Sequence, residues 1–259
     1  MLKRQRSLVA RTFLCLLLLV TTAPAWAGDN GSPIPSSRRQ LLLVVTPSYE
    51  ATQGFLYKFQ REKNSAAWKK VGEPVAIVVG RAGLGWGEGL HANIPANQPV
   101  KREGDGRSPA GVFALSTAFG FASPKEMHGL RFPYVQITAG LECVDDSASQ
   151  HYNTLVDRKK LGASDWQSSE KMFLIKHDYR LGVFVEHNTK PRRASNGSCI
   201  FLHIWGGATQ PTIGCTAMRN AEMEAIIKWL RSDAEPVLVQ LPQEEYARLR
   251  GVWQLPVIE

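Results

Sequence analysis

The residues best suited to chemistry in this chain are Cys215 and His203, which lies twelve positions earlier. Cys215 follows Gly214 and precedes a predicted helix, so exposed backbone N–H groups could lower the pKa of its thiol and stabilise an oxyanion. Gly214 leaves room for a substrate carbonyl beside the sulfur. A thiol and an imidazole together can carry out acyl transfer, with the cysteine as nucleophile and the histidine as general base. Spacing alone leaves open the alternative of two ordinary core residues.

The segment around His203 determines whether the two residues can meet. Its aromatic and aliphatic residues alternate over 201–205, which predicts a strand, and a strand-turn-strand connection would bring His203 back to Cys215. A zinc site made of Cys199, His203 and Cys215 would lack the close C-x-x-C pairing of such sites. We therefore expect no metal.

The first 27 residues have the pattern of a secretory signal peptide. A basic start precedes an apolar run over 13–20 and the small-x-small triplet Ala25-Trp26-Ala27. The apolar run is shorter than the roughly 20 residues that span a bilayer. We predict export, cleavage after Ala27, a periplasmic location and no stable membrane insertion of the mature chain.

Charge and glycine patterns exclude two classes of ligand. The formal charge of +8 falls to +4 when the four basic residues of the signal segment (Lys3, Arg4, Arg6 and Arg11) are subtracted. The remaining basic residues are scattered, unlike the basic stripe of a nucleic-acid-binding protein. The glycine-rich stretch 80–111 lacks the G-x-x-x-x-G-K-[ST] pattern of a phosphate loop. We expect neither a nucleic-acid partner nor a nucleotide.

The strands and helices that the sequence predicts around this pair indicate a single, mainly β domain with a few helices over residues 41–259. Residues 28–40 are polar and predict a linker that buries no core. Residues 221–231 predict a helix capped by Asn220, with its apolar residues on one face. Buried strands are predicted by short apolar runs at 41–45, 74–80 and 236–241.

Several motifs together resemble the YkuD-type L,D-transpeptidase catalytic domain family. The stretch 203–218 is similar to the family signature, a histidine followed by glycine and then a Ser/Thr-x-Gly-Cys nucleophile turn. The block 103–113 resembles EGDG-x-[ST]-P-A-G-x-F, which marks one branch of the family. Further similarity to that branch lies at 143–146, 152–153, 170–172, 187–188 and 197–203. The resemblance spans about residues 75–240 and implies a β-sandwich-type catalytic domain.

The resemblance implies a reaction and roles for individual residues. Cys215 matches the nucleophile, His203 its base, Gly214 the glycine of the turn and Thr212 its hydroxyl residue. Family members cleave the bond between the third residue of a peptidoglycan tetrapeptide stem and its terminal D-alanine. A thioester forms on the cysteine, and an amine of another stem resolves it without a cofactor. Candidates for contacts with the stem peptides are Thr212, Gly207, His187, Asn188 and Arg219.

The chain departs from the family at two positions beside the nucleophile. Many members have a histidine before the Gly-Cys pair and an arginine soon after it, whereas Ile213 and residues 216–218 (Thr-Ala-Met) stand here. Arg219 is the candidate substitute for that arginine. His187 is expected to orient His203 or to line the cleft.

Two further motifs have open interpretations. Asp145 and Asp146 could bind a substrate amine, or cap a turn. Three cysteines remain after signal cleavage, and an odd number leaves at least one thiol unpaired in an oxidising compartment. A disulfide between Cys143 and Cys199 would leave Cys215 free for chemistry.

The leading interpretation is a monomeric L,D-transpeptidase that acts on peptidoglycan stems. The same Cys–His pair would give an L,D-carboxypeptidase or cross-link hydrolase if water resolved the thioester, which depends on how well the cleft excludes water. A non-catalytic wall-binding module is the alternative from another class. A papain-like protease is disfavoured, because its cysteine precedes its histidine in the chain.

Overall fold

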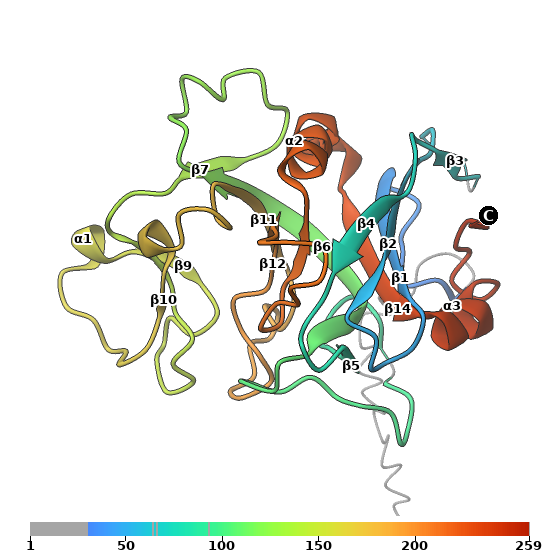
Figure 1. The fold of residues 1–259 in the computed structure, drawn as a ribbon, viewed down its shortest axis with the longest axis horizontal. Helices are drawn as coiled ribbons and strands as arrows, with labels where there is room; N and C mark the ends of the chain where they lie inside the picture. Colours follow the sequence, from blue (N-terminus) through green and yellow to red (C-terminus); the bar gives the residue numbers. More distant parts are fainter. Residues whose placement is uncertain (1–30, 64, 66, 93, 259) are drawn as a thin grey trace, which may run out of the picture.

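The computed structural model describes residues 31–63, 65, 67–92 and 94–258 (Figure 1). These residues form fourteen strands and three α-helices, which confirms the predicted mainly β fold. The predicted signal peptide, 1–27, and the start of the predicted linker lie outside the described residues. None of the described helices is both long and apolar enough to cross a bilayer.

The main sheet closes on itself. Its strands follow the order β1-β14-β6-β11-β12-β13-β4-β2, and β2 pairs again with β1. The domain is therefore built around one continuous ring of strands, in keeping with the mainly β catalytic domain that the resemblance implied. The bounds of these strands are β1 Gln40–Thr46, β2 Gln53–Gln60, β4 Val75–Val78, β6 Ser108–Gly120, β11 Leu181–Val185, β12 Phe201–Ile204, β13 Thr216–Met218 and β14 Val237–Pro242. Three short strands extend the ring: β3 (Lys69–Lys70), β5 (Leu84–Trp86) and β7 (Tyr134–Gln136).

The strands at the centre of the core do not alternate between buried and exposed residues. Every residue of β1 is buried, and so is every residue of its parallel neighbour β14. A continuous apolar run of this kind is typical of a strand covered on both faces. The helix α3 (Gln243–Leu249) packs against both strands and covers their outer side.

The predicted helix at 221–231 is confirmed as α2, Asn220–Trp229, which packs on β11 and β12. Met223, Ile226 and Ile227 form its buried face, as their spacing predicts. The predicted cap is wrong. Arg219 occupies the N-cap position, and the side-chain amide of Asn220 donates to Glu224 instead.

The predicted linker at 28–40 belongs partly to the core. Ser32 and Ile34 are buried, and Ile34 is part of the main hydrophobic cluster. The Ser32 hydroxyl donates to the carbonyl of Trp253, so this segment packs against the chain that follows α3. The prediction that residues 28–40 bury nothing is therefore wrong for this part, because one isoleucine among polar residues is enough to anchor it.

A small second sheet lies beside the ring, next to β11 and β12 (Figure 1). It consists of β8 (Leu141–Cys143), β9 (Leu155–Asp157) and β10 (Glu170–Lys171), and the one-turn helix α1 (Arg158–Leu161) follows β9. Glu142 on β8 is the polar centre of this sheet. Its carboxylate forms salt bridges with Arg158 at 2.7 Å and Lys171 at 2.8 Å, and it accepts hydrogen bonds from Trp166 and Ser169.

These contacts predict a pH-dependent contribution to stability. Burial alone raises the pKa of Glu142, but the hydrogen bonds from Arg158 and Lys171 outweigh it and lower the pKa to about 2. Because the pKa of Glu142 is lower in the folded state than the unfolded value of ~4.3, its ionised carboxylate stabilises the fold at pH values above ~4.3. This stabilisation is lost as the pH falls through about 2. We expect Glu142→Gln to lower the free energy of unfolding at neutral pH by on the order of 2 kcal/mol.

Urea denaturation at neutral pH and again near pH ~3 measures the effect. The exposed Glu62, changed to glutamine, is the matched control and should unfold like the wild type at both pH values. A destabilisation by Glu142→Gln that does not shrink in acid would contradict the assignment of these salt bridges.

Candidate active site

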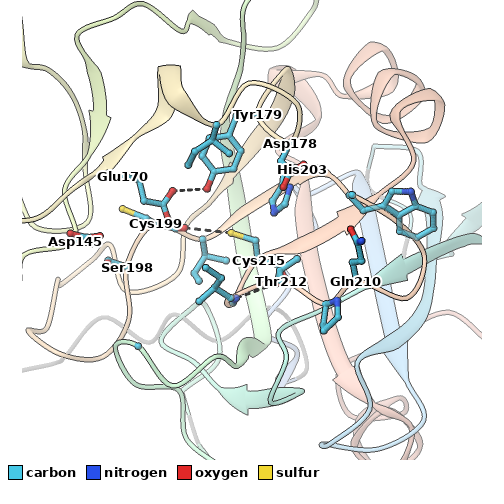
Figure 2. A pocket seen from close by; sticks show the side chains of 18 of the residues that line it. Asp145, Glu170, Asp178, Tyr179, Ser198, Cys199, His203, Gln210, Thr212 and Cys215 are labelled. Carbon is cyan, nitrogen blue, oxygen red and sulfur yellow. Dashed lines mark hydrogen bonds between the residues drawn. The ribbon is translucent and has the colours of Figure 1, made fainter.

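Cys215 stands immediately before β13 and lines a cavity of about 560 Å³ (Figure 2). The Sγ atom accepts a hydrogen bond from the backbone N–H of Phe201 at 3.3 Å, and the thiol donates to the carbonyl of Cys199 at 3.6 Å. Both contacts come from the chain that leads into β12. The nucleophile candidate is therefore held by backbone atoms of the strand that carries the candidate base.

The expectation that helix N–H groups lower the pKa of Cys215 is wrong. A strand, β13, separates the cysteine from α2, so its sulfur is not at a helix start. Burial raises the pKa of the thiol far above its ordinary value, and the negative charge of Glu170 adds to the shift. The N–H of Phe201 opposes these effects without cancelling them. The group is a thiol at neutral pH, so a base would have to take its proton for the sulfur to act as a nucleophile.

His203 lies on β12, which pairs in parallel with β13, and it lines the same cavity as Cys215. Its Nδ1 lies 2.8 Å from the carbonyl of Ile204, an arrangement that assigns the proton to Nδ1 and leaves the Nε2 lone pair free. Burial lowers the pKa of His203, so the ring is neutral near pH ~7. A neutral imidazole with a free nitrogen is the form that a general base requires.

Two hydroxyl groups fix the turn that carries the nucleophile. Thr212 Oγ1 donates to the carbonyl of Cys215 at 2.6 Å and accepts the N–H of Gly214 at 3.1 Å. Ser108 Oγ, from β6, donates to the same carbonyl at 2.7 Å and accepts the N–H of Gly80. Thr212 also lines the cavity, but its hydroxyl is occupied within the turn. Its observed role is therefore to hold the cysteine in place.

The 103–113 block connects the nucleophile turn to the loop before β12. The Asp105 carboxylate accepts hydrogen bonds from Lys101 Nζ and from the backbone N–H groups of Arg102 and Arg107. The Glu103 carboxylate accepts the hydroxyls of Tyr152 and Ser198. The block is thus an internal scaffold. Ser108, its member beside Cys215, was not among the predicted site residues.

His187 and Asn188 do not line the cavity, so their predicted roles in the cleft are wrong. His187 is buried elsewhere, where its Nδ1 accepts the N–H of Glu88 and its Nε2 bonds to the carbonyl of Asn196. Burial lowers its pKa to about 4, which removes it from acid–base chemistry at neutral pH. The Asn188 amide donates to the carbonyls of Arg193 and Gly197. Both residues brace the loop that leads to Cys199.

Two other predicted substrate contacts lie outside the cavity. The Arg219 side chain is 69% exposed and pairs with Glu222 on the first turn of α2, so it does not replace the family arginine in the cavity. Gly206 lines the rim, whereas its neighbour Gly207 does not. Asp145 does line the cavity, and Asp146 instead caps turns by accepting the N–H groups of Ala148 and Gln167.

The structure bonds Cys143 to Cys199, with an S–S distance of 2.07 Å and a Cα–Cα distance of 5.9 Å. Within the described part of the chain, Cys215 is the one free cysteine. The disulfide joins β8 of the small sheet to the residue whose carbonyl accepts the Cys215 thiol. The small sheet is thereby fastened to the wall of the cavity.

Sequence reasoning missed part of that wall. Tyr179 packs its ring edge-on against His203, with centroids 5.4 Å apart, and its hydroxyl donates to Glu170. Asp178 lines the cavity beside it. These residues are far from Cys215 in sequence and outside the nucleophile signature, so only the fold could reveal them.

Comparison with known proteins agrees with this geometry. The family model of the L,D-transpeptidase catalytic domain, YkuD, matches residues 49–239, which hold the ring strands from β2 to β13, the start of β14 and the whole cavity. This chain therefore belongs to the YkuD L,D-transpeptidase catalytic domain family. No curated protein or solved structure matches it. Membership supports an enzyme of the transpeptidase or acyltransferase type, from a family that acts on peptidoglycan.

The buried thiol predicts a distinctive pH dependence of alkylation. Because the pKa of Cys215 is raised, the thiolate fraction near neutrality is small. The rate of reaction with iodoacetamide should therefore keep rising through pH ~8.5, the ordinary pKa of a cysteine. Intact-mass kinetics on the disulfide-bonded chain would measure this, with Cys215→Ser as the unreactive control. A rate that levels off below pH ~7.5 would indicate a preformed thiolate and contradict the assignment.

Proposed function

We propose that this chain is a periplasmic L,D-transpeptidase that acts on peptidoglycan tetrapeptide stems through a Cys215 thioester, with His203 as the general base. The observation that carries this proposal is the pair itself. The protonated thiol of Cys215, just before β13, and the neutral imidazole of His203, on the parallel neighbour β12, line one cavity, and the hydroxyls of Ser108 and Thr212 hold the cysteine.

The protonation states suit a general-base route to the thioester. His203 Nε2 takes the thiol proton while Sγ attacks the carbonyl between the third residue of the stem and its terminal D-alanine. The imidazolium then gives that proton to the nitrogen of the departing D-alanine. The C–N bond breaks and the acyl group stays on Sγ. An amine of a second stem resolves the thioester, which forms the new cross-link and restores the thiol.

Incubation of the purified mature chain with disaccharide-tetrapeptides tests the reaction. We expect D-alanine release together with cross-linked dimers, and a covalent carbapenem adduct in the intact mass. Cys215→Ala should abolish all three, and His203→Gln should slow acylation by about 10²–10⁴-fold. Tripeptides without dimers would identify a hydrolase instead. Neither product nor adduct would identify a wall-binding module.

The periplasmic part of the proposal rests on the residues before the described domain. We expect the chain, expressed in full in a Gram-negative host, to accumulate in the periplasmic fraction with Gly28 as its first residue. Mass spectrometry of the isolated protein measures the new terminus. A chain that lacks 1–27 is the control and should stay in the cytoplasm. Recovery of the intact chain from the membrane fraction would argue for an uncleaved anchor.

A further inference from the structure

The wall of the cavity beside Cys215 carries acidic side chains that the thioester chemistry does not use. Glu170 comes from β10, and Asp145 comes from the chain just after β8. Figure 2 shows both on the side of the pocket that the small sheet forms, with the Glu170 carboxyl group beside the Tyr179 hydroxyl. The same tyrosine ring contacts His203.

A short series of contacts connects Glu170 to the wall of the cavity beside Cys215. Glu170 pairs with Cys143 in the register of β10 and β8, Cys143 is bonded to Cys199, and the carbonyl of Cys199 accepts the thiol of Cys215. The charge of Glu170 also contributes to the raised pKa of Cys215, so the two groups interact. The carboxyl group thus lines the same cavity as the sulfur, on the wall that the disulfide connects to Cys199.

Among the described residues, no cationic side chain forms a salt bridge with Glu170. Lys101 also lines the cavity, but its ammonium is paired with Asp105 at 2.6 Å. Tyr179 donates to one carboxyl oxygen only, and Asp145 Oδ1 is buried without a hydrogen-bond partner among the described residues. Burial, together with the charges of Asp145 and Glu103, raises the pKa of Glu170 to about 7, against the hydrogen bond from Tyr179.

The unpaired carboxylate oxygens on this wall suit a specific kind of ligand group. Free carboxylate oxygens accept hydrogen bonds, and a primary ammonium offers three donors and a compensating charge. A carboxylate that titrates near neutrality can also exchange a proton with such an ammonium. The proposed reaction consumes one primary amine, that of the acyl acceptor.

We propose that Glu170 is a second catalytic acid–base residue, which binds the ammonium of the acyl acceptor and removes its proton before attack on the thioester. This inference rests on the proposed function and concerns its second half-reaction. The acceptor class is a primary alkylammonium, and water is the competing nucleophile. Asp145 completes the acidic wall that attracts the acceptor.

The step balances in protons and bonds. The ammonium gives one proton to the Glu170 carboxylate and becomes a neutral amine. Its lone pair attacks the thioester carbon, the C–N bond forms, and the C–S bond breaks. The nitrogen gives its second proton through His203 to the departing sulfur. The products are an amide with one N–H, the Cys215 thiol and a protonated Glu170, which then loses its proton to solvent.

The test separates formation of the thioester from its resolution. Wild type and Glu170→Gln are acylated with the tetrapeptide donor, and the thioester is then resolved by either a D-amino acid or hydroxylamine. Hydroxylamine is uncharged at neutral pH and needs no proton removed beforehand. We expect Glu170→Gln to form the thioester and to release it to hydroxylamine at the wild-type rate. Its reaction with the D-amino acid should fall at least ~10-fold, so that hydrolysis takes a larger share.

Two control variants, and a separate measurement of acylation, distinguish a specific role of Glu170 from a general loss of structure. Glu170→Asp keeps the carboxylate and should recover most of the amine transfer, whereas Glu62→Gln, outside the cavity, should behave as wild type. Normal acylation reports that the variant site is folded. If Glu170→Gln does not acylate, Glu170→Ala takes its place in the same comparison, and a Glu170→Ala thioester that reacts with the D-amino acid at the wild-type rate overturns the proposal.

Two other results have distinct meanings. An unchanged ratio of amine transfer to hydrolysis in a fully acylating Glu170→Gln would overturn the role of Glu170 and leave the transpeptidase proposal standing. Absence of any Cys215 thioester in the wild type would overturn the proposed function, and the role of Glu170 with it.

Discussion

The parallel pairing of β12 with β13 is the constraint on which the site depends. It sets Leu202 opposite Thr216 and His203 opposite Ala217, which lies two residues past Cys215, so that His203 and Cys215 share one face of the sheet. A slip of one residue would move His203 to the opposite face of the sheet. Because β12 and β13 lie inside a closed ring, their other neighbours hold the register from both sides. The placement of Cys215 relative to His203 is therefore a property of the whole sheet.

Sequence motifs identified the residue types of the site, but could not show which way side chains face. Cys215 and His203 were predicted from their spacing and the family resemblance, and the structure places both in one cavity. His187 and Asn188 stand in an equally distinctive motif, yet they brace a loop. The reason is that a buried hydrogen-bonding scaffold restricts residue choice as strongly as a ligand does. The raised pKa of Cys215 also depends on burial, which a single segment does not reveal.

The departures from the family pattern have a structural basis in β13. Thr216 donates to Gln240 inside the ring, and Ala217 and Met218 are fully buried, so an arginine at these positions would put an unpaired charge in the core. Arg219 is the first residue that can point outward, and it does so away from the cavity. Ile213, which stands where many members have histidine, is 73% exposed at the cavity rim. Acidic side chains on the cavity wall are instead supplied by Glu170 of the small sheet and by Asp145, just after β8.

The closed ring also governs how this protein meets other copies of itself. Strand edges with unpaired backbone groups are templates for intermolecular pairing, and a ring removes them from its member strands. The described strand at the outer side of β2 is β3, two residues long and made of the exposed Lys69 and Lys70. Two positive charges on so short an edge repel a second copy that approaches strand to strand. The fold that aligns His203 with Cys215 thus also discourages aggregation through its main sheet.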